Sequence, residues 1–153
     1  MICYLDSSAL VKLYLDEPGG QEVSQALDEA FLTGTVSISR AEVVAALSKA
    51  VRVGALSAED AASARHRFHV QWQDHFRLPV SDLLIEHACY LAWAHQLRGY
   101  DSVQLAAALG WQASLDVPVR MATFDVHLWR TAGHVGLEPY PPGLPELREI
   151  WKK

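Results

Sequence analysis

The sequence predicts one α/β domain, layered around a mostly parallel sheet of four to five strands. Short apolar runs of strand length alternate along the chain with longer segments whose apolar residues recur at helical spacing. Helices between strands allow the strands to pair in parallel through right-handed crossovers. A length of 153 residues suits a single domain, and a hydrophobic share of 50% is ample for a buried core.

Five short segments have the composition of strands, because each is apolar or β-branched and is bounded by polar residues, glycine or proline. These segments are residues 2–5, 35–38, 78–80, 117–124 and 136–140, of which the last resembles an edge strand. In an open parallel sheet the active crevice lies beyond the carboxyl ends of the strands. The residues that directly follow each strand are therefore the first candidates for a functional site.

Seven segments have the apolar periodicity of helices. They cover residues 7–14, 20–31, 39–54, 57–76, 84–99, 100–115 and 125–132. Ser39 with Glu42, and Ser57 with Asp60, have the spacing of a capping box, in which the first side chain accepts from a helix amide. Residues 137–153 form a last strand and a proline-containing tail with a short charged end.

Composition excludes several classes of protein. No run approaches the roughly 20 apolar residues of a membrane helix, and the N-terminus lacks a signal-peptide pattern, so we expect a cytoplasmic protein without a membrane partner. Cys3 and Cys89 lie in apolar patterns and are expected to be small buried residues in a reduced protein. A formal net charge of −5 argues against nucleic-acid binding by bulk charge.

Four acidic residues follow expected strands or open expected helices, and all four would face one edge of the sheet. They are Asp6, Glu42, Asp101 and Asp125. Each also has a purely structural explanation, because acidic side chains commonly cap helices and complement the helix dipole. Taken together, the four acids predict a cation site, since several carboxylates in one crevice repel each other unless a cation neutralises them. Oxygen-only clusters suit Mg²⁺ or Mn²⁺, ions that activate water for attack on a phosphodiester.

The acids lie within four motifs that occur in a fixed order. The motifs are residues 4–14 followed by Glu17 and Gly19, residues 38–43, residues 97–108, and residues 123–125 followed by Leu128, Ala132 and residues 136–137. With these motifs, nearly the whole chain resembles PIN-domain ribonucleases of the VapC toxin type. The resemblance implies a three-layer α/β/α PIN domain over residues 1–153. It also implies a metal-dependent endoribonuclease that is the toxin of a type II toxin–antitoxin system.

The resemblance further implies roles for individual residues. Asp6, Glu42, Asp101 and Asp125 would bind Mg²⁺ or Mn²⁺ and carry catalysis, while hydroxyl groups would orient the ligating carboxylates. Those hydroxyls belong to Ser7, Ser8 and Thr123. The family often has another acidic or amide residue shortly after the fourth acid, whereas residues 126–128 here are Val, His and Leu. One firmly held ion is therefore expected, with room for a second that RNA phosphate would recruit.

Three basic residues are candidate RNA contacts. Arg40 and Arg98 flank two of the acids, and His127 lies two residues beyond Asp125. Phosphate binding and ion pairing with nearby acids are equally compatible with the two arginines. His66 and His69 have a spacing that could share a zinc ion, although no third ligand is evident.

Partner proteins follow from the resemblance rather than from composition. The family implies a cognate antitoxin, which we expect in a groove near the helices of residues 20–31 and 39–76, and a homodimer. Trp72 and Phe76 lie four residues apart on the expected helix of residues 57–76, a spacing typical of core packing.

Two alternatives remain at this level. The first is a catalytically silent module that uses the same fold to bind a protein partner or RNA, with the four acids acting only as caps. The second is a metal-dependent phosphatase, which the absence of a glycine-rich phosphate loop disfavours.

Overall fold

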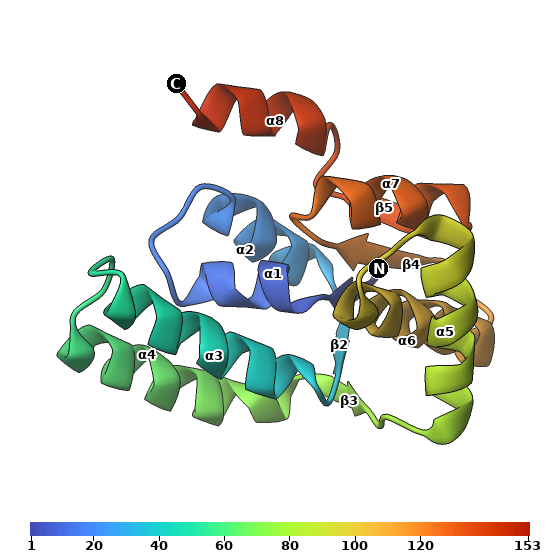
Figure 1. Ribbon diagram of the computed structural model, residues 1–153, viewed down its shortest axis with the longest axis horizontal. Coiled ribbons are helices and arrows are strands. Elements are labelled where there is room, and N and C mark those ends of the chain that lie inside the picture. The colour runs from blue at the N-terminus through green and yellow to red at the C-terminus, as the bar shows by residue number, and fades with distance from the viewer.

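A five-stranded sheet divides the molecule into layers, as the computed structural model of residues 1–153 shows (Figure 1). All strand pairs are parallel, and the strand order is β3-β2-β1-β4-β5. The strands are β1 (Ile2–Leu5), β2 (Leu32–Val36), β3 (Phe76–Leu78), β4 (Val119–Ala122) and β5 (Glu138–Tyr140). Because β1 and β4 are central neighbours, the segments that follow them begin side by side at one edge of the sheet.

Eight helices connect and cover the strands. They are α1 (Ser7–Leu10), α2 (Gly20–Glu29), α3 (Ser39–Arg52), α4 (Ala58–Gln71), α5 (Asp82–His95), α6 (Gly99–Leu115), α7 (Val126–His134) and α8 (Leu144–Trp151). Short 3₁₀ turns extend α1 and α4, at Val11–Leu13 and Trp72–Asp74. The predicted layered α/β class, with its mostly parallel sheet of four to five strands, is confirmed.

Alternation along β1 separates the core into two halves. Ile2 and Tyr4 pack with α5, α6 and α7, whereas Cys3 and Leu5 pack with α1 to α4 and α8. Each half contains at least 16 buried apolar residues, so both faces of the sheet are closed. This is the three-layer α/β/α arrangement.

Helix α6 lies unusually close to the sheet. Its run Ala106–Ala108 is buried, and Trp111 lies over Gly34 of β2. A Cβ atom at Gly34 would come within 2.5 Å of the Trp111 ring, so only glycine fits this contact without a shift. The close approach fixes α6, and with it Asp101 in its first turn, relative to the strands.

Several expected boundaries are wrong. The second strand begins at Leu32, not at Thr35, and the fourth ends at Ala122. The fourth helix ends at Gln71, and Phe76, expected in that helix, opens β3 and stacks on Trp111 with ring centroids 5.8 Å apart. Long-range pairing of β3 with β2 overrides the local helical pattern.

Three further findings concern single residues and the tail. Cys3 is buried as predicted, but Cys89 is exposed on α5. Trp72 is buried, in agreement with a core position. The tail forms α8, where the sequence predicts no helix. None of the helices combines the length and apolarity needed to cross a membrane.

Candidate active site

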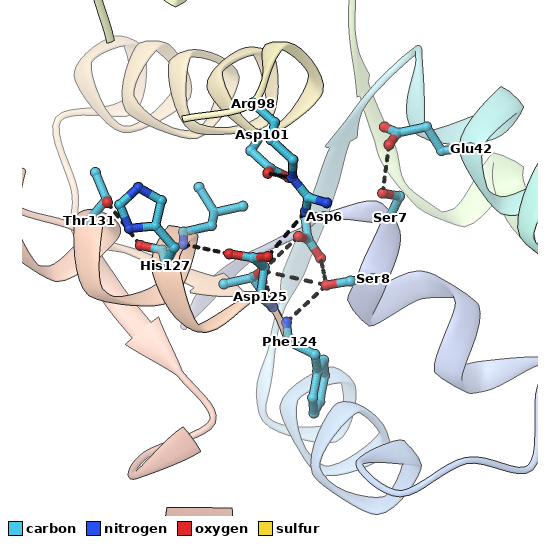
Figure 2. Close-up of polar contacts among 12 residues, drawn as sticks. Asp6, Ser7, Ser8, Glu42, Arg98, Asp101, Phe124, Asp125, His127 and Thr131 are labelled. Carbon is cyan, nitrogen blue, oxygen red and sulfur yellow. Dashed lines mark hydrogen bonds and ion pairs between the residues drawn. The ribbon is translucent and has the colours of Figure 1, made fainter. Parts of the chain in front are cut away.

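The segments that follow β1 and β4 and the start of α6 bring three carboxylates together (Figure 2). Asp6 directly follows β1, Asp125 lies three residues beyond β4, and Asp101 lies in the first turn of α6. This is the edge of the sheet that the parallel strand order predicts for an active crevice.

Asp6 is buried and fully engaged by donors. It is the N-cap of α1 and accepts from the Ala9 amide (2.9 Å) and the Ser8 hydroxyl (2.6 Å) at Oδ1. Its Oδ2 accepts from the Thr123 hydroxyl at 2.7 Å. Burial raises the pKa of Asp6 to about 6, the three donors act in the opposite direction, and the negative charge of Asp101 adds to the increase. The carboxyl group of Asp6 is therefore held in one orientation, and its ionisation is unfavourable in this buried position.

Asp125 combines a helix cap with an ion pair. Its Oδ1 accepts from the Leu128 amide at 2.8 Å at the start of α7, and its Oδ2 accepts from Arg98 at 3.1 Å. The Asp125 amide donates to the Thr123 hydroxyl. Thr123 thus links the two acids that follow neighbouring strands, because the same hydroxyl also donates to Asp6.

Arg98 lies between two of the acids, as Figure 2 shows. Its Nε donates to Asp101 at 2.7 Å and its Nη2 to Asp125 at 3.1 Å, while 77% of the side chain remains exposed. The hydrogen bond to Asp101 and the charges of both acids raise the pKa of the guanidinium. Of the two roles open to Arg98 from the sequence, the structure shows the ion pair.

Glu42 lies apart from the three aspartates on the first turn of α3 (Figure 2). Its Oε2 accepts from the Ser7 hydroxyl at 3.0 Å and its Oε1 from the Gln104 amide group at 2.8 Å. The expected capping box of Ser39 with Glu42 is wrong: Glu42 turns toward α1 and α6, and the Ser39 hydroxyl bonds to Thr35 and Gln104.

Gln104 is a residue that sequence reasoning missed. It is buried in the apolar part of α6, accepts from the Tyr4 hydroxyl at 2.6 Å, and donates to both Ser39 and Glu42. The signal was an amide inside the apolar run of α6, between Val103 and Leu105, where a buried polar group needs partners. Its position fixes the carboxylate of Glu42.

Comparison with known proteins defines the family. The PIN domain model matches residues 3–133. The chain belongs to the PIN domain family. It is 32% identical over 143 residues to Ribonuclease VapC45 of Mycobacterium tuberculosis (strain CDC 1551 / Oshkosh), which covers 94% of this chain and 97% of the relative. The same figures hold for Ribonuclease VapC49 of Mycobacterium tuberculosis (strain ATCC 25618 / H37Rv).

A solved structure has the same fold. The chain is similar to a chain of a toxin–antitoxin complex from Klebsiella pneumoniae, with a TM-score of 0.65 and 19% sequence identity. The match covers 90% of this PIN chain and 98% of that one.

The donor set of this PIN domain fits a hard divalent cation in its chemistry. Asp6, Asp101, Asp125 and Glu42 present only oxygen atoms, the ligands that Mg²⁺ and Mn²⁺ prefer. No three His, Cys, Asp or Glu side chains are arranged as a ready metal site. The hydrogen bonds give the reason, since Asp6 faces hydroxyl and amide donors while Asp101 and Asp125 face Arg98.

A cavity connects Glu42 to one of the three aspartates, Asp101. Its volume is about 640 Å³, its lining is mostly apolar, and Glu42, Arg98 and Asp101 all border it. Tyr100, which is exposed, and Cys89 contribute to the wall. The cavity places the fourth acid on the same open space as Asp101, although no hydrogen bond joins them.

The other two candidate RNA contacts lie outside this group of acids. The His127 ring nitrogen Nε2 is 2.9 Å from the carbonyl oxygen of His95, so it donates to the backbone of α5. Arg40 points toward α4, where its Nη2 lies 3.0 Å from Nδ1 of His69. That contact also disfavours zinc at His66 and His69, because a guanidinium occupies one of the nitrogens a metal would use.

Proposed function

We propose that this protein is a VapC-type endoribonuclease, the toxin of a type II toxin–antitoxin pair, which hydrolyses RNA phosphodiester bonds in the cytoplasm. The observation that carries the proposal is the convergence of Asp6, Asp101 and Asp125 at the carboxyl end of the two central strands. Two ribonucleases of the VapC type, each 32% identical across almost the full length, support it. We further propose that residues 1–153 act as one PIN domain.

Asp6, Asp101, Asp125 and Glu42 would hold Mg²⁺ or Mn²⁺. When bound, such an ion lowers the pKa of a coordinated water and stabilises the charge that develops on the attacked phosphate. The buried Asp6 carboxyl would lose its proton in favour of the ion, because a cation offsets the desolvation that raises its pKa. One firmly held ion is proposed, since residues 126–128 are Val, His and Leu and supply no further acidic or amide ligand after Asp125.

Three hydroxyl groups would orient the ligating carboxylates. Ser8 donates to Oδ1 of Asp6 and Thr123 to Oδ2, while Ser7 donates to Glu42. Fixed rotamers reduce the entropic cost of assembling the site when a ligand arrives. The same bonds keep both carboxylates from turning away into solvent.

Arg98 is the best placed of the candidate RNA contacts. Its guanidinium is exposed and lies at the acids, so it could hold a phosphate oxygen of the bound strand by a two-point contact. Arg40 and His127 would contact the strand farther from the cut, from α3 and α7.

A homodimer and an antitoxin complex complete the proposal. Helix α5 exposes a row of large apolar side chains, which supports pairing with a second copy of the chain. These side chains are Leu83, Tyr90 and Trp93. The antitoxin is proposed because a structural neighbour belongs to a toxin–antitoxin complex.

The decisive experiment compares RNA ends in cells that express the wild type, Asp101→Asn or Asp116→Asn. Asp116 is the control because it is exposed at the end of α6, and its positive φ of 53° suits asparagine. We expect growth arrest and discrete new RNA ends with the wild type and with Asp116→Asn only. Cleavage at the wild-type rate by Asp101→Asn would refute the assignment.

Calorimetry with Mn²⁺ separates the nuclease from a silent binding module. We expect the wild type to bind the ion with measurable heat, and the variant in which all four acids are changed to amides to show none. Absence of metal-linked heat in the wild type would favour the module.

A further inference from the structure

Helices α3 and α4 lie side by side and form a hairpin beside the sheet (Figure 1). Between them is a pocket of about 520 Å³. Its rim carries four nitrogen-bearing side chains and its floor is apolar. The rim is Arg40, Arg65, His66 and His69, and the floor includes Val44 and Phe68.

The charge of this pocket is exceptional for this chain. No carboxylate lines it, although the protein has 18 acidic against 13 basic residues. Like most arginines of the chain, Arg40 and Arg65 make no ion pair, but these two line the same pocket. Two arginines that stay unpaired in an acidic protein concentrate positive potential at one surface site.

The contact of Arg40 with His69 leaves a free donor on the histidine ring. A guanidinium can only donate, so Nδ1 of His69 accepts at 3.0 Å and the ring proton lies on Nε2. That Nε2 makes no hydrogen bond within the chain. Arg65, one turn before His69 on α4, adds a second free guanidinium. The pocket thus offers several N–H donors and no acceptor with a negative charge.

We infer that this pocket binds a phosphate group of the RNA strand, at a distance from the bond that is cut. Guanidinium and imidazole N–H groups are the donors that phosphate takes, and the apolar floor suits the adjoining sugar. The inference rests on the proposed function and adds a site to it. It also gives His66 and His69 a role as donors to phosphate, in place of the zinc site that their spacing suggests.

RNA is favoured over an acidic protein segment by the position of Arg40. Arg40 and Glu42 lie two residues apart in the first turn of α3, so pocket and catalytic edge are joined by one rigid element. Because Glu42 faces α1 and α6 and Arg40 faces α4, a strand that is cut at the acids would reach the pocket by crossing the first turn of α3, with no rearrangement of the fold. The phosphate contact then fixes the register of the strand without reading its sequence.

The test measures binding of a fluorescently labelled single-stranded RNA oligonucleotide to the full-length protein in EDTA, over a range of salt concentrations. Arg65→Gln is compared with Arg52→Gln, which removes the same charge from an exposed arginine on α3 that neither lines the pocket nor pairs with an acid. Circular dichroism and thermal melting verify that both variants fold.

We expect Arg65→Gln to weaken RNA binding about three- to tenfold at low salt and to flatten the plot of log affinity against log salt by about 0.7. Arg52→Gln should bind as the wild type does. Equal behaviour of the two variants, or no RNA binding by the wild type, would overturn the inference. Unchanged RNA binding with a weakened complex between Arg65→Gln and an acidic protein partner would also overturn it.

Failure of this inference is distinguishable from failure of the nuclease assignment. Wild type that cleaves RNA while Arg65→Gln binds like Arg52→Gln refutes the pocket and leaves the nuclease. If the wild type never cleaves RNA but its RNA binding depends on Arg65 and not on Arg52, the nuclease assignment is refuted and the pocket is supported.

Discussion

Asp6 connects the proposed catalysis to stability, because the carboxyl group proposed to ionise and hold a cation is also among the most buried polar groups of the fold. Only 2% of its surface is exposed. The Ser8, Thr123 and Ala9 donors satisfy its oxygens without removing the cost of burying a charge. In the absence of a cation, the site therefore stores unfavourable electrostatic energy that a bound ion would release.

This cost predicts the pH dependence of stability. The pKa of Asp6 rises from 3.8 to about 6, so the native state holds the proton more tightly than the unfolded chain. Asp6 contributes fully to the free energy of unfolding below about pH 4. This contribution is lost as the pH rises through 6, and the loss is about 3 kcal/mol at most. Chemical denaturation in EDTA at pH 4 and pH 8 should show this loss in the wild type and not in Asp6→Asn.

Asp116→Asn is the matched control for this measurement, since it alters an exposed aspartate. Its free energy of unfolding should follow the wild type at both pH values. If Asp6→Asn loses as much stability as the wild type between pH 4 and pH 8, burial of Asp6 does not set the pH dependence.

Arg98 acts as an internal cation at the position where a metal ion would meet Asp101 and Asp125. An ion must displace its guanidinium, so Arg98→Gln should bind Mn²⁺ about three- to tenfold more tightly in calorimetry, a modest gain because the pair is exposed to solvent. Arg120→Gln is the control, because Arg120 also bridges two carboxylates, Glu29 and Glu138, elsewhere on the surface. Weaker Mn²⁺ binding by Arg98→Gln would show instead that Arg98 organises the acids.

At the scale of elements, the approach of α6 to β2 determines where Asp101 lies. Gly34→Ala would place a methyl group 2.5 Å from the Trp111 ring, and we expect a loss of about 1–3 kcal/mol from overpacking. Gly110→Ala is the matched control, because nothing lies within 4 Å of its Cβ position and alanine favours a helix by about 1 kcal/mol. Urea unfolding should therefore shift in opposite directions for the two variants.

The sequence predicts elements well where local and tertiary preferences agree. The parallel sheet and the helices α2, α3, α6 and α7 follow from apolar periodicity and from strand-to-helix alternation. Phe76 was assigned to a helix because it continues the spacing of Trp72, yet it pairs opposite Gly34 and stacks on Trp111. Such partners lie more than thirty residues away along the chain, beyond what a local pattern reports.

Helix α8 shows a different limit of local reasoning. The sequence predicts only a proline-containing tail, but Pro145 lies in the first turn of the helix, where a missing amide proton costs nothing. Gly143, with φ of 65°, precedes that turn. Proline therefore marks the start of a helix here and does not indicate that a helix is absent.

The grouping of three aspartates at one edge of the sheet was predictable from the sequence, but their contacts were not. The motifs identified Asp6, Asp101 and Asp125, which the structure brings together at the edge of the sheet. The partners of Glu42 are Ser7 and Gln104, which lie 35 and 62 residues away and replace the expected capping box. The bridge made by Arg98 depends on the position of α6 relative to α7, which the spacing of residues alone does not give.

At the scale of the whole molecule, one face of α5 has no partner within the chain. Leu83 and Tyr90 lie one heptad apart and Trp93 follows on the next turn, with 89% of the Trp93 surface exposed. Large exposed aromatic side chains are costly in water and common at interfaces between subunits. The proposed homodimer would cover this face and leave the acids and the α3–α4 pocket on other surfaces.

Trp93→Glu tests this assembly. A buried carboxylate at the centre of an apolar interface would lack a partner, so we expect the variant to sediment as a monomer at concentrations where the wild type is a dimer. Phe31→Glu is the control, because Phe31 is similarly exposed, at 78%, but lies just before β2 and away from α5. Dissociation by Phe31→Glu, or a dimer that survives Trp93→Glu, would place the interface elsewhere. A dimer that depends on Trp93 alone would fix the relative positions of two active sites and limit the RNA shapes that can reach them.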